Sequence, residues 1–128
     1  MLKVGIEGSK EIFVTEELTA ERVGSGLLPV YATPQMIALM ENVASTSVEG
    51  ELEDGQGTVG TKIEVSHVSA TPVGMKVIVS TKLVEIDRKR LVFKVRAVDE
   101  AGLIGEGIHE RFIIDNKKFM EKAKTKLS

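Results

Sequence analysis

The sequence predicts an α+β domain in which an antiparallel β-sheet wraps around one long central helix. Three observations support this fold class: one long apolar stripe at helical spacing, four long stretches rich in β-branched residues, and short connections between those stretches. Because parallel strands need a crossover of about a dozen residues, the short connections indicate antiparallel pairing. At 128 residues the chain has room for one globular domain, expected to span residues 1–128.

The first third of the chain predicts one short strand and one loop. Residues 12–15, with their β-branched and aromatic side chains, are typical of a strand. The stretch from Glu21 to Pro29 is rich in glycine and indicates a mobile loop. Leu27 and Leu28 give this loop an apolar tip that could cover a pocket.

The central helix is predicted from Pro34 to Val48. Thr33 is expected to be its N-cap, because a threonine cap followed by proline at the first helical position is a common way to begin a helix. Apolar residues then recur every three or four positions, which predicts a continuous buried stripe. The stripe consists of Met36, Ile37, Met40, Val43, Ala44 and Val48.

The second half of the chain predicts four long strands and a terminal helix. The first strand alternates Val59, Thr61, Ile63 and Val65 with polar residues, which indicates one buried face. A charged hairpin turn at residues 87–90 connects the second and third strands, and the lysine-rich tail 116–126 predicts a short surface helix. The four strands are expected at 58–70, 76–86, 91–98 and 103–114.

Composition excludes several classes of function. Seventeen Lys and Arg residues against nineteen Asp and Glu give a net charge of −2, so nucleic acid is not an expected partner. Without cysteine the chain has no disulfide, thiolate nucleophile or Cys-ligated zinc. There is no secretion signal at the N-terminus and no apolar run of the roughly 20 residues that span a bilayer, so we expect a cytoplasmic protein that does not enter membranes.

Three polar residues lie where the predicted core meets solvent. Glu41 stands on the flank of the helical stripe, although an exposed helix glutamate is the simpler interpretation. His67 continues the alternating face of its strand inward, where a hydrogen-bonded core histidine is the simpler interpretation. Thr33 caps the helix, whose N-terminal dipole could hold a developing oxyanion.

Other candidate motifs predict less chemistry. His109 and Arg111 lie on one face of the last strand, and a polar sheet edge is the favoured interpretation. The glycines at 102, 105 and 107 do not form a dinucleotide fingerprint and indicate backbone room or bulges. No metal-ligand spacing or G-x-S-x-G elbow is present, so we expect neither metal nor cofactor.

Three stretches resemble the fluoroacetyl-CoA thioesterase family, whose members have the hot-dog fold. Residues 30–41 read VYATPQMIALME, residues 60–74 read GTKIEVSHVSATPVG, and residues 105–111 read GEGIHER. The resemblance implies that the catalytic threonine, glutamate and histidine of the family fall on Thr33, Glu41 and His67. It also implies a homodimer with the pocket at its interface, and an acyl-CoA substrate.

The same resemblance suggests which residues bind the substrate. The glycine that opens the family's G-T strand falls on Gly60, and its H-E-R motif ends at Arg111. We assign both to substrate binding, together with Leu28 of the apolar loop. The family's fluoroacetyl-hydrolysing member has phenylalanines before its A-T pair that form a lid, whereas residues 24–31 here have none. The resemblance therefore predicts thioester hydrolysis without predicting fluoroacetyl selectivity.

The predicted mechanism gives Glu41 and His67 the roles of base or nucleophile and of proton shuttle, with Thr33 in the same network. The sequence leaves open which group attacks the thioester. An alternative is a non-catalytic module of the same fold that binds acyl-CoA or a small acid. A hydratase acting on enoyl-thioesters is a weaker alternative, because the matched residues are those of the thioesterase.

Overall fold

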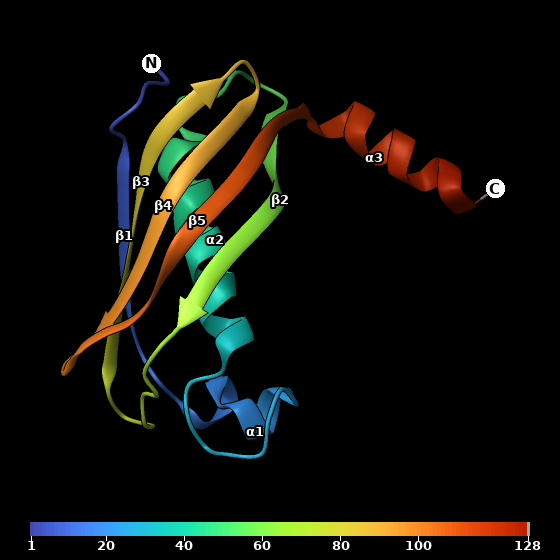
Figure 1. Cartoon of the computed structure of the whole chain (residues 1–128). Helices are drawn as coiled ribbons and strands as arrows, with labels where there is room; N and C mark the ends of the chain where they lie inside the picture. The colour runs from blue at the N-terminus through green and yellow to red at the C-terminus, as the bar shows by residue number, and fades with distance from the viewer. Residues whose placement is uncertain (128) are drawn as a thin grey trace.

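A five-stranded antiparallel sheet and the long helix α2 make up the body of the protein (Figure 1). The structure is a computed structural model, and it describes residues 1–127. The strands are β1 (Glu7–Phe13), β2 (Gln56–His67), β3 (Lys76–Asp87), β4 (Arg90–Asp99) and β5 (Gly102–Asp115). The helices are α1 (Ala20–Val23), α2 (Thr33–Glu49) and α3 (Asn116–Lys124).

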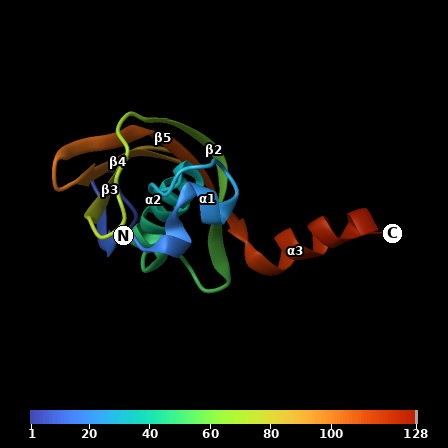
Figure 2. The same cartoon turned by 90° about the horizontal axis from the view of Figure 1, so that it is seen from below.

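The sheet curves around α2, so the predicted fold class is confirmed (Figure 2). Its strand order is β1-β3-β4-β5-β2, and every neighbouring pair is antiparallel. The four strands predicted in the second half are all present, with boundaries that differ by at most three residues. Their short connections are what require antiparallel neighbours, as the sequence indicated.

The core lies between the inner face of the sheet and one side of α2. Five residues of the predicted helical stripe are buried, and Ile37 is half-buried. They pack on aliphatic and aromatic side chains from β3, β4 and β5. The sheet side of this core includes Val77, Val79, Leu83, Leu91, Phe93, Val95, Ala97 and Ile104.

The N-terminal part differs from its prediction. β1 begins at Glu7 and ends at Phe13, earlier than the predicted strand, because it pairs along β3 from Lys82 to Lys76. Pairing with a neighbour, rather than β-propensity, fixes these limits. Residues 20–23 form the single turn α1, which ends at Gly24 in the left-handed conformation, so only the rest of the predicted loop is irregular.

A β-bulge interrupts β2, so the alternation predicted for residues 59–65 does not hold along the whole strand. Gly60 pairs with Arg111 and Lys62 with Glu110, so Thr61 is an extra residue on β2. One extra residue reverses which face the following side chains occupy. Val59, which precedes the bulge, therefore does not share a face with Ile63, Val65 and His67.

The β2 side of the body has an unpaired strand edge and a projecting helix. Within the described residues, β2 pairs only with β5, so its other edge is free. The predicted tail helix is present as α3, which projects beyond β2 in both views (Figures 1 and 2). No helix in residues 1–127 is long and apolar enough to cross a membrane.

Candidate active site

Thr33 and His67 meet at the beginning of α2. Thr33 Oγ1 and His67 Nδ1 are joined by a hydrogen bond of 2.7 Å. Thr33 is the first helical residue and Ala32 occupies the N-cap, so the predicted threonine cap is wrong by one position. The hydroxyl is therefore not used to cap the helix and instead binds the imidazole at the end of β2.

The environment of His67 favours its neutral form. Its Nε2 atom is buried and has no hydrogen-bond partner among the described residues. Burial lowers the pKa of His67 below its ordinary value of 6.5, against a smaller opposite contribution from the Ser69 backbone. A neutral imidazole bonded to a hydroxyl can act as a general base.

The pair borders a hollow of about 310 Å³ between α1, the start of α2 and the segment that follows β2. Tyr31 forms part of its wall and is itself buried, which raises its pKa to about 12. Leu28 does not line this hollow: its side chain is 65% exposed on the loop beside it. Ser25 and Val30 of the same loop do line the hollow.

Glu41 lies in a second group, two turns further along α2. Its Oε2 is 3.9 Å from Nη1 of Arg111, and both lie beside Gly60 of β2. A methyl group at Gly60 would stand 2.8 Å from Glu41 Oε2, so the missing side chain makes room for the carboxylate. Glu41, Gly60 and His109 line a hollow of about 220 Å³.

His109 and Arg111 are buried, so their interpretation as a polar sheet edge is wrong. β5 is an inner strand, between β4 and β2, and both side chains point toward the helix side. Nδ1 of His109 donates to the Lys62 carbonyl (2.8 Å), which fixes the tautomer, and Nε2 accepts from Arg111 Nη1 (3.1 Å). Burial and the Arg111 charge lower the pKa of His109, and the Lys62 carbonyl and Glu41 oppose this shift.

Thr58 accepts two hydrogen bonds from Arg111. The sequence did not identify Thr58 as a candidate residue. The guanidinium donates to Thr58 Oγ1 (2.8 Å) and to the Thr58 carbonyl (2.9 Å). Burial lowers the pKa of Arg111, and Glu41 partly offsets this effect. Thr58 faces Arg111 only because of the bulge at Thr61, for which the sequence gives no alternation signal.

Within one chain, the structure brings Thr33 to His67 but does not bring Glu41 to either. Thr33 and Glu41 are eight residues apart on one helix, which places their Cα atoms about 12 Å apart along its axis. His67 and Gly60 are separated along β2 by about 23 Å at the usual rise per residue. The two hollows share no lining residue.

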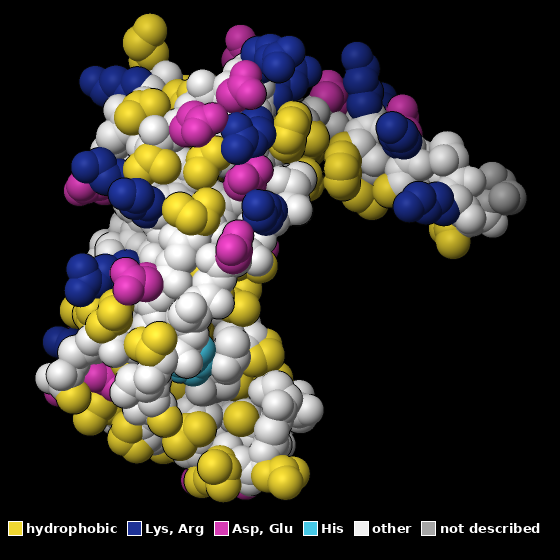
Figure 3. Space-filling view, in the orientation of Figure 1, with side chains coloured by type: hydrophobic (Ala, Val, Ile, Leu, Met, Phe, Trp, Pro, Cys, Tyr) yellow, Lys and Arg dark blue, Asp and Glu magenta, His cyan; other side chains and the backbone are white. Residues whose placement is uncertain are grey.

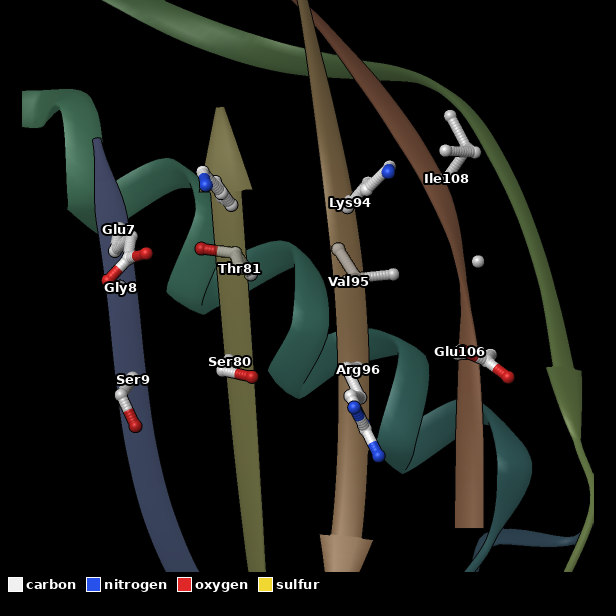
Figure 4. A pocket seen from close by; sticks show the side chains of 12 residues that line it. Glu7, Gly8, Ser9, Ser80, Thr81, Lys94, Val95, Arg96, Glu106 and Ile108 are labelled. Carbon is white, nitrogen blue, oxygen red and sulfur yellow. The ribbon is translucent and has the colours of Figure 1, made fainter. Parts of the chain in front are cut away.

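A further hollow, of about 730 Å³, lies on the outer face of the sheet and holds none of the predicted site residues. Figure 4 shows exposed side chains of both charges there, among them Glu7, Lys94, Arg96 and Glu106. Its mixed charge and open shape give no indication of a reactive centre. In residues 1–127, no group of three or more His, Asp or Glu side chains is placed to hold a metal ion.

The chain matches one family of known proteins both by a family model and by sequence identity to a relative. A family model described as "Fluoroacetyl-CoA-specific thioesterase" matches residues 14–117. The fluoroacetyl-CoA thioesterase of Streptantibioticus cattleyicolor is 40% identical over 97 residues, which cover 76% of this chain and 70% of that protein.

Solved structures agree with this match. A structure of the fluoroacetyl-CoA thioesterase superposes with a TM-score of 0.93 at 32% identity over 98% of both chains. A thioesterase superfamily member from Thermus thermophilus gives 0.89 at 30% identity, covering 98% of this chain and 93% of that one. A hot-dog-like protein from Thermanaerovibrio acidaminovorans, at 20% identity, shares the fold with a TM-score of 0.91 over 99% of this chain and 94% of its own.

Proposed function

Because the chain belongs to the fluoroacetyl-CoA-specific thioesterase family and is a thioester hydrolase, we propose that it hydrolyses a small acyl-CoA at a site shared by two copies. Thr33 and His67 come from one copy of a homodimer and Glu41 from the other. The observation that carries this proposal is the His67 imidazole, bonded to Thr33 through Nδ1 while its buried Nε2 lacks a partner among residues 1–127 of its own chain.

The free edge of β2 supports this assembly. A two-fold axis that pairs β2 antiparallel with its copy would extend the sheet without breaking any hydrogen bond. It would also set the two α2 helices side by side in opposite directions. The beginning of each helix then moves toward the middle of the other, where Glu41 lies.

In this arrangement the three residues can act as a nucleophile, a base and an orienting carboxylate. Thr33 Oγ attacks the thioester carbonyl carbon while its proton passes to His67 Nδ1, and the partner's Glu41 accepts the hydrogen bond from Nε2–H. The C–S bond then breaks, and the CoA thiolate takes the proton from His67. Water, activated by His67, hydrolyses the acyl-threonine and releases the acid.

The site also contains groups that could hold the substrate. The helix dipole at the beginning of α2 favours the negative charge that develops on the carbonyl oxygen. Gly60 leaves the β2 backbone open beside Glu41, and Arg111 supplies a buried positive charge next to it. Leu28 lies on the exposed loop beside the Thr33–His67 hollow, where it could contact an acyl chain.

The test is the release of free thiol from a panel of short acyl-CoA esters. We expect E41Q and H67A each to lower kcat/KM by at least about 100-fold, the usual effect of losing acid–base catalysis. E49Q, at the exposed end of the same helix, is the matched control and should keep parental activity. Parental activity in E41Q or H67A would contradict the site, and CoA binding without thiol release would favour a binding module.

A further inference from the structure

Helix α3 is held by very little of its own chain. It spans nine residues, none of them buried, and it continues into a short 3-10 turn at Thr125–Leu127. Figures 1 and 2 show it standing away from the body beyond the free edge of β2. Isolated helices shorter than about 12 residues are marginal in water, so α3 needs a surface to pack on.

One side of α3 is apolar, and the remainder is mainly basic, with Glu121 as the one acidic residue of the helix. At 100° per residue, Phe119, Met120 and Ala123 fall within an arc of about 100°, and Figure 3 shows hydrophobic side chains along the lower side of this helix. Phe119 is 41% exposed and Met120 is 50% exposed. The remaining surface and the following turn carry Lys117, Lys118, Lys122, Lys124 and Lys126.

The proposed homodimer determines which surface α3 would meet, and the inference rests on that assembly. β5 pairs Asp115, just before α3, with Gln56 at the start of β2, and it pairs Gly105 with His67 at the end of β2. When β2 pairs antiparallel with its copy, the start of one strand lies beside the end of the other. Each α3 therefore extends toward the His67 end of the partner subunit.

The surface at that end complements α3 in both polarity and charge. Its exposed apolar side chains are Leu27 (90%), Leu28 (65%) and Val68 (60%), and Figure 3 shows hydrophobic side chains gathered at this end of the body. The neighbouring segment carries three carboxylates, on Glu16, Glu17 and Glu21, and one cation, Arg22, which pairs with Glu16 at 3.7 Å. Apolar residues can meet the apolar side of α3, while the carboxylates face its lysines.

We propose that α3 of each copy packs on the partner's residues 24–29 and on the segment after its β2. That loop borders the Thr33–His67 hollow, so each copy helps to cover the active site of the other. The occupant of the apolar side of α3 is thus a second copy of this chain.

The absence of native cysteine makes a cross-linking test specific. Phe119→Cys and Leu28→Cys are introduced into separate, differently tagged chains, which are co-expressed and treated with a short bismaleimide. A covalent heterodimer is expected, and neither variant alone should cross-link. Lys118→Cys paired with Leu28→Cys is the matched control, because Lys118 lies on the opposite side of α3 and should give little product.

Sedimentation and thiol release, measured on the cysteine-free parent, separate the possible failures. If the parent is a dimer that hydrolyses acyl-CoA but the variants cross-link equally through residues 118 and 119, or not at all, the α3 inference alone is overturned. A monomer would overturn both the inference and the shared site. Binding of the parent to anionic vesicles, lost in the double variant F119Q/M120Q and without cross-linking to Leu28→Cys, would assign α3 to a membrane surface instead.

Discussion

Gly60 controls how closely Glu41 approaches the backbone of β2. A methyl group there would meet Glu41 Oε2 at 2.8 Å and His109 Cε1 at 3.2 Å. Since the glutamate is the flexible partner, the carboxylate would move while the strand stays in place. A shift of about 1 Å in a catalytic group can lower rates by about 100-fold.

We therefore expect Gly60→Ala to reduce kcat/KM by at least about tenfold and to lower the unfolding free energy by less than about 1 kcal/mol. Thiol release and guanidinium unfolding measure the two effects. Gly50→Ala is the matched control, because a methyl group at Gly50 meets nothing within 4 Å and the residue already has a helical conformation. Equal activity in the two variants would show that the position of Glu41 does not depend on Gly60.

The lowered pKa of His109 makes the unfolding free energy depend on pH. Its pKa is lowered in the folded protein, chiefly by burial, so the unfolded chain binds a proton more readily. This histidine's contribution is therefore complete above the ordinary pKa of 6.5 and declines as the pH falls from there toward the folded value. His109→Asn keeps a donor for the Lys62 carbonyl but does not titrate.

The unfolding free energy of the parent should thus decline more steeply than that of His109→Asn between pH 7 and pH 5. Denaturant unfolding at several pH values provides the measurement. Parallel curves for the two proteins would mean that His109 takes up a proton equally well in the folded and unfolded states.

At the scale of elements, the bulge in β2 separates what the sequence could predict from what it could not. Alternation correctly grouped Ile63, Val65 and His67, which are half-buried between exposed neighbours. It failed for Val59, because the added residue Thr61 has no signature in a pattern of period two. The bulge turns Thr58 and Gly60 toward Arg111 and Glu41, so this part of the candidate site depends on a feature visible only in the register.

Strand order explains the other main difference. His109 and Arg111 alternate on one side of β5, as expected, but their burial depends on β5 lying between β4 and β2. The pairing of β2 with β5 could not be predicted from closeness in the sequence, because β5 begins 35 residues after β2 ends. Glu110, between them, points to the opposite face and pairs with Arg90 at 2.9 Å, which lowers its pKa.

At the scale of the whole molecule, local signals predicted the central helix, the four long strands and their antiparallel pairing. The resemblance nominated Thr33, Glu41 and His67, and the contact between Thr33 and His67 is present. The separation of Glu41 from that pair was not predicted, because spacing along a helix and a strand gives no distance between them.

A shared site predicts complementation between two inactive variants. A mixed dimer of E41Q and H67A has one site with the parental Thr33, His67 and Glu41, and one site with both substitutions. If chains pair at random, half of the dimers are mixed, so co-refolding should restore about a quarter of parental thiol release. Each variant refolded alone is the control, and no recovery in verified mixed dimers would place all three residues in one chain.

If the site is shared as proposed, the separation of Thr33 from Glu41 along α2 also links catalysis to the amount of protein in the cell. On the proposed assembly, a newly translated chain folds its half-sites before it meets a partner and cannot yet consume acyl-CoA. At low expression the rate of hydrolysis then rises with the square of the chain concentration, and it becomes linear once dimers predominate. On the proposed assembly, dilution below the dissociation constant of the dimer would by itself switch the thioesterase off.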